Sequence, residues 1–213
     1  MQATRIIAIR HGETAWNVDG RIQGQLDVPL NETGRWQAER LGRALAASEQ
    51  ASAVYSSDLL RAWDTARAVA ERMGIPQRDA LGLRERAFGR FEGKTFPDLE
   101  AQHPAETARW RRRDPDWAPP GGESLHDFRS RVLQATEALA RQHLGEQIIL
   151  VAHGGVLDVL YRRAIGAELE ATRTWELANA SINRLLWTPD ALTIVGWADR
   201  SHLEDEWLDD ATA

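Results

Sequence analysis

The sequence contains no cysteine, and Lys94 is its only lysine. Without cysteine the chain can form neither disulfide bonds nor thiolate-based metal or iron–sulfur sites, and a cysteine nucleophile is excluded. The chain also starts without a long apolar run, because residues 6–9 are too few for a signal-peptide core or a membrane span. We therefore expect a soluble, cytoplasmic protein with no membrane partner, whose chemistry uses side chains other than thiols.

Acidic residues outnumber basic ones, 32 against 26, which gives a formal net charge of −6. A surface of this sign argues against a general nucleic-acid binder. All but one of the basic residues are arginine, which suits bidentate recognition of phosphate or carboxylate, although codon bias alone explains such an excess. The 213 residues, 43% of them hydrophobic, predict a single domain over residues 1–213.

Short apolar runs alternate with patterns of helical period, and this alternation is typical of an α/β fold. Thr33 is placed to cap the first long helix, Gly74 to end the second, and Ser124 to cap the third. The apolar runs cover residues 6–9, 53–55, 148–152, 182–187 and 192–197. The pattern predicts a three-layer α/β/α sandwich with a mostly parallel central sheet.

Between these regular parts lies a stretch that is rich in arginine and tryptophan and broken by five prolines between residues 97 and 120. We interpret it as a small, mainly helical cap inserted at about residues 86–122. The acidic residues at about 203–213 predict a solvated C-terminal tail.

Three polar clusters each follow an apolar run directly: residues 10–14, residues 56–58 with Arg61, and residues 153–155. Because the carboxyl ends of parallel strands share one edge of an open sheet, and ligands bind there, the clusters should converge. They would bring two histidines and at least two arginines into one pocket. Guanidinium groups match the oxygens of a phosphoryl group, and an imidazole facing the phosphorus could act as a nucleophile.

The same clusters carry a family resemblance. Six motifs occur in consistent order between about residues 6 and 183, and a chance match of all six is improbable. The motifs are Arg10-His11-Gly12-Glu13-Thr14 with Arg21-Ile22-Gln23-Gly24, Ser56-Ser57-Asp58 with Arg61, Leu83-Arg84-Glu85, Gly89 with Glu92-Gly93, Gly121-Gly122-Glu123-Ser124, and His153-Gly154-Gly155. The sequence resembles the histidine phosphatase superfamily, also called the phosphoglycerate mutase-like family, in its phosphatase branch.

This resemblance implies roles for five residues. His11 would attack phosphorus as a neutral imidazole, with its other ring nitrogen bonded to an acceptor that the sequence does not identify. Arg10, Arg61 and a protonated His153 would bind the phosphoryl oxygens. Glu85 would protonate the leaving oxygen and later activate water. For Glu85 the sequence also allows a plain surface ion-pair cluster with its two neighbouring arginines.

Further residues complete the predicted site. Asn17 and Gln23 would be neutral donors, and Gly24 and Gly154 would let the backbone approach the phosphate. No metal or cofactor is expected, because arginine supplies the positive charge. We expect Glu13, Asp58 and Glu92 to orient loops and four further histidines to lie on the surface: His103, His126, His143 and His202.

The resemblance covers both phosphatases and 2,3-bisphosphoglycerate-dependent mutases. Mutases typically have Gly-Trp where this chain has Gly24-Gln25, and they carry a longer basic insertion. Arg109, Arg111, Arg112 and Arg113 keep the mutase alternative open, although a solvated basic helix face is the simpler interpretation. Trp110 and Trp117 would either contact a leaving group or anchor the cap.

The expected function is that of a metal-independent phosphomonoesterase that hydrolyses a small phosphorylated metabolite through a phosphohistidine. The alternative is a 2,3-bisphosphoglycerate-dependent phosphoglycerate mutase, and a non-catalytic phospho-ligand binder is a third hypothesis. We expect a small phosphate ester as partner and no nucleic acid. The sequence leaves open whether the protein forms a homodimer.

Overall fold

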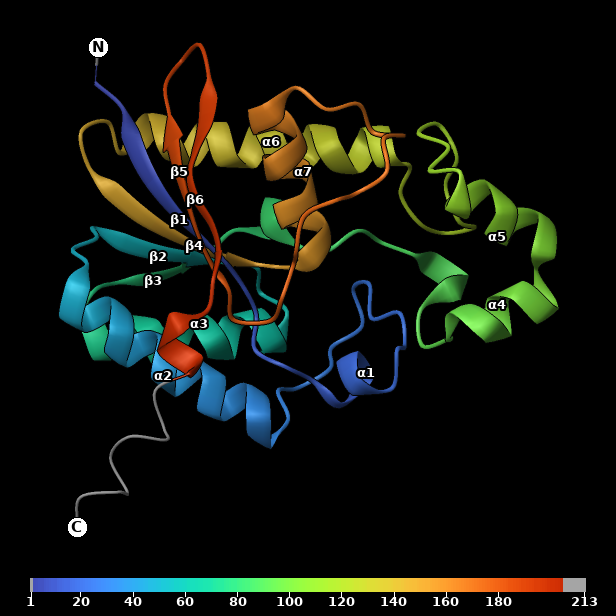
Figure 1. Ribbon diagram of the computed structural model, residues 1–213, viewed down its shortest axis with the longest axis horizontal. Coiled ribbons are helices and arrows are strands. Elements are labelled where there is room, and N and C mark those ends of the chain that lie inside the picture. Colours follow the sequence, from blue (N-terminus) through green and yellow to red (C-terminus); the bar gives the residue numbers. More distant parts are fainter. Residues whose placement is uncertain (1, 205–213) are drawn as a thin grey trace.

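The computed structural model describes residues 2–204 (Figure 1). Its centre is a six-stranded sheet with the order β3-β2-β4-β1-β5-β6. The strands are β1 (Thr4–Arg10), β2 (Ala53–Ser56), β3 (Gln77–Asp79), β4 (Gln147–Ala152), β5 (Ile182–Trp187) and β6 (Leu192–Asp199). The first four in the sheet order are mutually parallel, and β5 and β6 are antiparallel to their neighbours. The prediction of a mostly parallel sheet is confirmed.

Helices cover both faces of the sheet, as the layers in Figure 1 show. They are α2 (Glu32–Ser48) and α3 (Leu60–Met73) on one face, and α6 (Leu125–Gln142) and α7 (Gly154–Ile165) on the other. Side chains alternate along β1, so that Ile7 and Ile9 pack with Leu41 of α2, whereas Ile6 packs with Val132 of α6. The three-layer sandwich therefore has an apolar core on each side of its sheet.

Local signals explain where the long helices begin and end, with one correction. Ser124 caps α6 by accepting from the backbone N–H of Asp127 at 3.0 Å, and Gly74 ends α3 with a left-handed φ of 67°, both as predicted. The prediction of Thr33 as the cap of α2 is wrong. The Asn31 side chain accepts from Gly34 N–H at 2.7 Å instead, so the helix begins at Glu32.

Two elements lacked a sequence signal. β3 is a three-residue edge strand of polar residues, and its pairing with β2 rather than its own composition defines it. The short helix α1 (Ala15–Val18) is fixed by a capping box between Thr14 and Asn17. β1 is longer than the apolar run that predicted it, because ladder pairing continues through Arg5 and Arg10.

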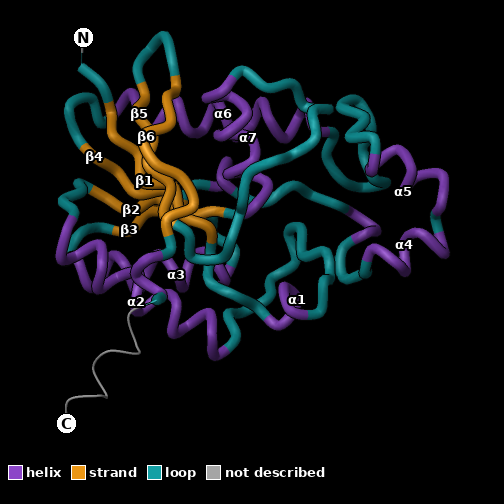
Figure 2. Tube along the Cα trace, in the orientation of Figure 1, coloured by secondary structure: helices purple, strands orange, loops and turns teal. Residues whose placement is uncertain are grey.

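The cap lies to one side of the sheet, where loops connect short helices (Figure 2). These are the 3₁₀ helix η2 (Gly89–Phe91) and the α-helices α4 (Phe96–Gln102) and α5 (Pro104–Arg111), which follow the 3₁₀ helix η1 (Leu81–Leu83). The cap has its own small core of Phe91, Leu99 and Trp117. Trp117 is only 7% exposed and thus anchors the cap.

Arginines of the cap are used mainly for internal contacts. Arg109 pairs with Asp114 at 2.7 Å and Arg111 with Glu100 at 2.7 Å; both are exposed side chains of α5, where a solvated basic face was expected. Arg113 differs from that expectation. It reaches the core, donating to the Leu169 carbonyl at 2.5 Å and to Asp158 of α7 at 2.9 Å. Arg113 therefore joins the cap to the sheet domain.

Two further expectations from the sequence concern the C-terminal tail and membrane-spanning helices. The predicted acidic tail at 203–213 lies outside the described residues except for Leu203 and Glu204. Within residues 2–204, no helix has the length and apolar character needed to cross a membrane.

Packing between α2 and the sheet predicts a specific loss of stability. Leu41→Ala removes a side chain with 0% exposure and should lower the free energy of unfolding by about 2–5 kcal/mol. The matched control is Leu60→Ala at a side chain that is 41% exposed, with an expected change within about 0.5 kcal/mol. Urea unfolding of the three proteins measures the difference. Equal losses in the two variants would contradict the assigned packing.

Candidate active site

The parallel pairing of β1 with β4 brings two histidines together. Arg10 is opposite Ala152 in the register, so His11 and His153 follow at the same edge of the sheet. Their ring centroids are 5.2 Å apart, with the planes tilted by 58°. The structure thus brings the polar clusters that contain His11 and His153 together, as predicted.

His11 is held as a neutral imidazole in one orientation. Its Nδ1 lies 2.7 Å from the Gly12 carbonyl, which can only accept a hydrogen bond, so the proton is on Nδ1 and Nε2 keeps its lone pair. Burial, followed by the charges of Arg61 and Arg10, holds the pKa of His11 well below 6.5. The acceptor that the sequence left unidentified is therefore a backbone carbonyl one residue away.

The backbone around Gly12 is fixed from three sides. Gly12 N–H donates to the Thr65 hydroxyl at 3.0 Å, and the Asn179 amide donates to the His11 carbonyl at 2.9 Å. A Cβ on Gly12 would lie 2.4 Å from the Gly34 carbonyl oxygen, so only glycine fits there. Sequence reasoning did not assign Thr65 or Asn179 to the site. Thr65, one helical turn after Arg61, offered a signal; Asn179, in a loop before β5, offered none.

The guanidinium group of Arg61 is buried and is oriented by two backbone carbonyls. Its Nη atoms donate to Gly24 at 2.7 Å and Leu26 at 2.8 Å, and Nε is buried without a partner among the described residues. Burial lowers the pKa of Arg61 to about 10, so it stays charged at neutral pH. Gly24 has φ of 52°, and a Cβ there would meet Glu92 at 2.1 Å. Gly24 thus orients Arg61 through its carbonyl.

Arg10 comes from the end of β1 and is directed by the loop after α7. It donates to the Leu177 carbonyl, and its Nε is buried with no partner within residues 2–204. Burial lowers the pKa of Arg10, while Glu85 acts in the opposite direction. A Cβ on Gly154 would be 3.5 Å from Arg10 Nε, an ordinary contact. Gly154 therefore lies beside Arg10 at the first turn of α7.

His153 is fully buried, and neither ring nitrogen has a partner in the described part of the chain. Burial, followed by Arg61, His11 and Arg10, holds its pKa well below 6.5. Without a bound ligand the ring is therefore neutral, because burial and two neighbouring guanidinium groups disfavour a further charge. A protonated His153 with a phosphoryl group bound stays a prediction. A phosphoryl dianion bound among these groups would shift the balance toward the protonated ring.

Glu85 is fixed by backbone donors from two segments. Its Oε2 accepts from Gly155 N–H at 2.9 Å at the start of α7, and its Oε1 accepts from Arg86 N–H at 2.8 Å. The neighbouring side chains have other partners: Arg84 pairs with Asp58, and Arg86 donates to the Glu123 carbonyl at 2.9 Å. The alternative of a surface ion-pair cluster around Glu85 is therefore wrong.

A half-buried ion pair beside Glu85 had no role in the sequence-based site. Arg131 of α6 forms a bidentate ion pair with Glu123, at 2.7 and 2.8 Å. The same guanidinium donates to the carbonyls of Arg84 at 3.0 Å and Glu85 at 3.3 Å. Arg131 thus holds the segment that carries Glu85 against α6.

Two cavities meet at these residues. The smaller, about 180 Å³, contains His11 and Arg61 together with Asn17, Gln23 and Gly24. The larger, about 380 Å³, extends toward α7 and the cap. Both are lined by Arg10, Glu85, Phe88 and Trp110. The arrangement offers a cationic pocket at His11 that opens past Glu85 into a wider space.

Asn17 and Gln23 both line the smaller cavity, as predicted. Asn17 Oδ1 accepts from the Thr14 backbone and hydroxyl, both at 3.0 Å, which leaves its NH₂ group as the donor toward a ligand. Gln23 is 9% exposed. Among the residues that orient loops, Glu92 accepts from Gln25 N–H at 3.0 Å and Phe88 N–H at 2.9 Å.

The remaining histidines divide into two groups. His126 is exposed as expected, but His202 is buried at 7% exposure, where burial lowers its pKa. His143 bonds Tyr55 at 2.8 Å and Glu146 at 2.6 Å and is largely covered. The surface assignment is wrong for His202, whereas His103 and His143 are partly buried. Within residues 2–204, no group of three or more His, Asp or Glu side chains is arranged to hold a metal ion.

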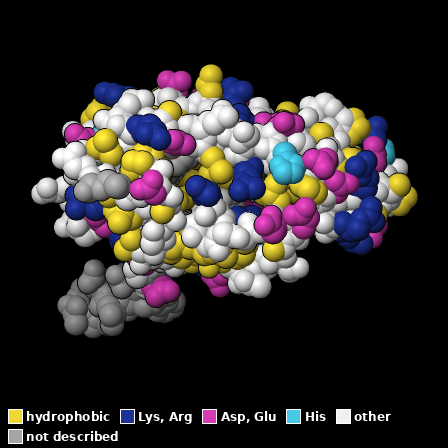
Figure 3. Space-filling model, turned by 90° about the horizontal axis from the view of Figure 1, so that it is seen from above, with side chains coloured by type: hydrophobic (Ala, Val, Ile, Leu, Met, Phe, Trp, Pro, Cys, Tyr) yellow, Lys and Arg dark blue, Asp and Glu magenta, His cyan; other side chains and the backbone are white. Residues whose placement is uncertain are grey.

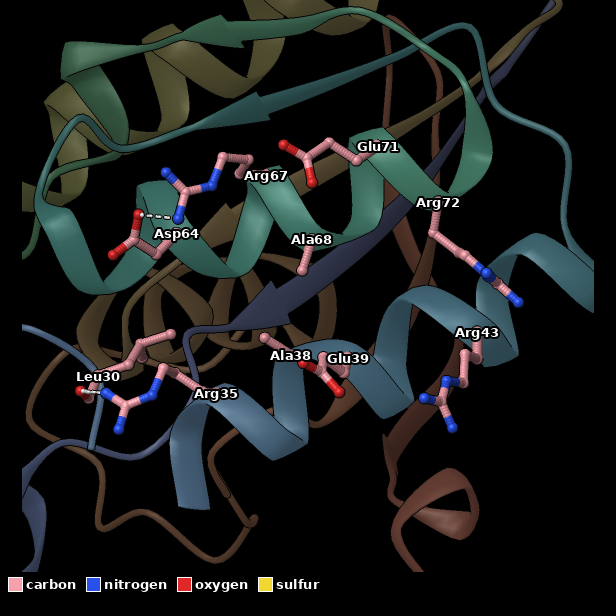
Figure 4. A pocket seen from close by; sticks show the side chains of 10 residues that line it. All are labelled: Leu30, Arg35, Ala38, Glu39, Arg43, Asp64, Arg67, Ala68, Glu71 and Arg72. Atoms are coloured by element: carbon pink, nitrogen blue, oxygen red, sulfur yellow. Dashed lines mark hydrogen bonds and ion pairs between the residues drawn. The ribbon is translucent and has the colours of Figure 1, made fainter. Parts of the chain in front are cut away.

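A separate cavity of about 600 Å³ lies between α2 and α3, away from His11 (Figure 4). Its charged side chains come from both helices, and Arg67 pairs with Asp64 at 3.1 Å. Arg35 donates to the Leu30 carbonyl at 2.8 Å. None of its lining residues is among those placed around His11.

The family model of the histidine phosphatase superfamily, branch 1, matches residues 6–200, which include the whole set of residues placed around His11. The chain belongs to this superfamily. Within it, the chain is 40% identical over 207 residues to the phosphoglycerate mutase-like protein 4 of Arabidopsis thaliana, covering 94% of this chain and 87% of the relative. It is 38% identical over 204 residues to the metal-independent phosphoserine phosphatase of the same plant, covering 95% and 84%.

A solved structure supports the same relationship. A mycobacterial glucosyl-3-phosphoglycerate phosphatase superposes with a TM-score of 0.81 at 33% sequence identity, covering 93% of this histidine phosphatase and 100% of that chain.

The buried neutral histidines of this histidine phosphatase predict how its stability depends on pH. The unfolded chain takes up protons on histidine below pH 6.5, whereas folded His11 and His153 do not, so unfolding binds protons there. The free energy of unfolding should be greatest above pH 6.5 and fall as the pH drops below it. Each such histidine contributes up to about 1.4 kcal/mol per pH unit.

Urea unfolding between about pH 7.5 and 5 measures this slope. His153→Asn should reduce it, while His126→Asn, at an exposed side chain, should leave it unchanged. A wild-type stability that does not vary over this interval would contradict the assignment.

Proposed function

We propose that the protein is a phosphomonoesterase that hydrolyses a small phosphorylated metabolite through a phosphohistidine on His11. The observation that carries the proposal is the state of His11, whose Nδ1 proton is bonded to the Gly12 carbonyl and whose Nε2 is left with a free lone pair in a cationic cavity. An imidazole in that state is a nucleophile at neutral pH. Arg10 and Arg61 beside it suit an anionic electrophile.

The reaction has two steps. In the first, His11 Nε2 attacks phosphorus, the bond to the leaving oxygen breaks, and Glu85 gives that oxygen a proton. In the second, Glu85 takes a proton from water, the water oxygen attacks phosphorus, and the P–N bond breaks to release phosphate and neutral His11. The position of Glu85 between the two cavities supports both roles.

The positive groups around His11 supply the electrostatic part of catalysis. The unpartnered Nε–H groups of Arg10 and Arg61, together with one N–H of the His153 ring, are donors for the phosphoryl oxygens. Because these groups are buried and fixed by backbone carbonyls, they need no reorganisation as charge shifts during transfer. Arginine thereby takes the place that a metal ion has in other phosphoryl-transfer sites.

The mutase alternative is less well supported. Arg109 and Arg111 are exposed and paired with acidic residues, and Arg113 binds Asp158, so these cap arginines have other partners than a substrate carboxylate. Relatives with phosphatase names also favour hydrolysis, although the mutase-like name of another relative keeps both chemistries within the family. A cytoplasmic location and homodimer formation stay predictions.

Replacement of His11 tests the nucleophile. His11→Ala should abolish both phosphate release from p-nitrophenyl phosphate and the acid-labile phosphoenzyme, with loss of at least about 10³-fold in rate. The wild-type enzyme should keep its activity in EDTA. Residual phosphoenzyme in His11→Ala, or loss of wild-type turnover with the chelator, would refute the proposal.

The hydrogen bond between Gly155 and Glu85 tests the proton donor. A Cβ at residue 155 would lie 2.2 Å from Glu85 Oε1, so Gly155→Ala must displace the carboxylate. We expect kcat for an alkyl phosphate to fall about 10²-fold, with a smaller loss for p-nitrophenyl phosphate, whose leaving group needs no proton. Gly154→Ala, where the nearest atom is 3.5 Å away, should have a smaller effect. Equal losses with both substrates would count against Glu85 as the acid.

A further inference from the structure

The cavity of about 380 Å³ beyond Glu85 is lined by aromatic and aliphatic side chains and by several charged ones. Phe88 and Trp110 stack with ring centroids 4.9 Å apart and a 14° interplanar angle, forming one wall. Leu125, Phe128, Val159 and Leu169 complete the apolar lining. A volume of about 380 Å³ suits a small metabolite.

The charged groups of this cavity are mostly committed to contacts within the protein. Arg86 donates to the carbonyls of Glu123 at 2.9 Å and Trp117 at 3.2 Å. Arg113 is bonded to Asp158 and to the Leu169 carbonyl, and Asp158 is shared with Arg162 at 2.9 Å. These side chains shape the cavity but have few donors left for a ligand.

Arg173 is the exception among the charged side chains of this cavity that lie outside the smaller cavity at His11. It lines the cavity from the loop between α7 and β5, is exposed, and forms no hydrogen bond or ion pair within residues 2–204. It lies close enough to lower the pKa values of Arg10 and Arg113. In Figure 3, arginine and lysine side chains lie near the middle of the molecule, between the sheet domain and the cap. An unpaired guanidinium at this position adds a positive charge that no described residue neutralises.

We propose that Arg173 is a specificity-determining residue that binds a carboxylate on the leaving group of the substrate. This inference rests on the proposed phosphatase activity and goes beyond it by naming the substrate class: phosphate esters of small carboxylic acids. One planar guanidinium pairs with one carboxylate through two parallel hydrogen bonds. The phosphoryl group of the same molecule would occupy the smaller cavity at His11, with Glu85 between the two ends.

This places carboxylate recognition in the loop after α7 and outside the cap. The cap arginines Arg109 and Arg111 have acidic partners, and Arg112, which is exposed, lines neither cavity. Arg112→Gln is therefore a matched control for Arg173→Gln, since both variants remove one exposed arginine.

Two pairs of substrates that differ by a carboxylate test the proposal. The first pair is O-phosphoserine and O-phosphoethanolamine, and the second is 3-phosphoglycerate and glycerol 3-phosphate. The wild-type enzyme should prefer the carboxylate member of at least one pair. Arg173→Gln should lower kcat/KM for that member about 10- to 100-fold, mainly through KM, and change the other member less than about twofold. Arg173→Lys should recover part of the loss, and Arg112→Gln should match the wild type.

The outcomes separate this inference from the proposed function. Wild-type turnover of p-nitrophenyl phosphate with a phosphohistidine, but without carboxylate preference in either pair, would overturn the role of Arg173 alone. An equal loss on both members of a pair in Arg173→Gln would do the same. Absence of turnover and of phosphohistidine in the wild type would instead refute the phosphatase itself.

Discussion

The hydrogen bond from His11 Nδ1 to the Gly12 carbonyl is the contact on which the rest of the site depends. It puts the imidazole proton on one nitrogen and aims the other at the cavity. That carbonyl can serve only if the backbone of Gly12 is itself immobile. Thr65 from α3, the Asn179 amide and the close approach of Gly34 at the start of α2 supply this rigidity. Elements from several parts of the chain are thus needed to define one tautomer.

An acidic protein concentrates positive charge at this edge of the sheet by burying arginines that backbone carbonyls direct. Arg61 donates to two carbonyls and Arg10 to one, while each keeps an unpartnered Nε. The net charge of −6 is therefore a property of the surface and does not describe the cavity. Burial, reinforced by these charges, keeps the pKa of both active-site histidines well below 6.5, which suits His11 as a nucleophile and leaves the protonation of His153 dependent on its ligand.

Much of this site could be predicted from sequence, because the signals were local. Polar residues that directly follow apolar strands must meet where parallel strands end, and this placed His11, Arg61 and His153 together. Asn179 and Arg131 could not be found in that way. Their roles depend on long-range contacts with the His11 and Glu85 carbonyls, and nothing in their own neighbourhoods indicates these contacts. His202 was misassigned for the same reason, since packing across the fold decides its burial.

Errors in the fold have a similar origin. Thr33 and Asn31 are both acceptable helix caps, and the choice between them depends on how the preceding loop approaches α2. β3 has too few apolar residues to be predicted from its own sequence. Its pairing with β2 is what makes it a strand. Local sequence patterns therefore predicted where most helices and strands lie, whereas contacts with neighbouring elements determine the residues at which they begin and end.

Glu85 directly precedes the cap in the sequence, but it contacts helices that cover the sheet. The first turn of α7 donates to one oxygen of its carboxylate, and Arg131 of α6 donates to its backbone carbonyl, so two of its contacts come from helices that pack on the sheet. Neither of these two contacts involves a residue of the cap. The carboxylate that handles the proton and Arg173, where we place carboxylate recognition, are thus held by different segments of the chain.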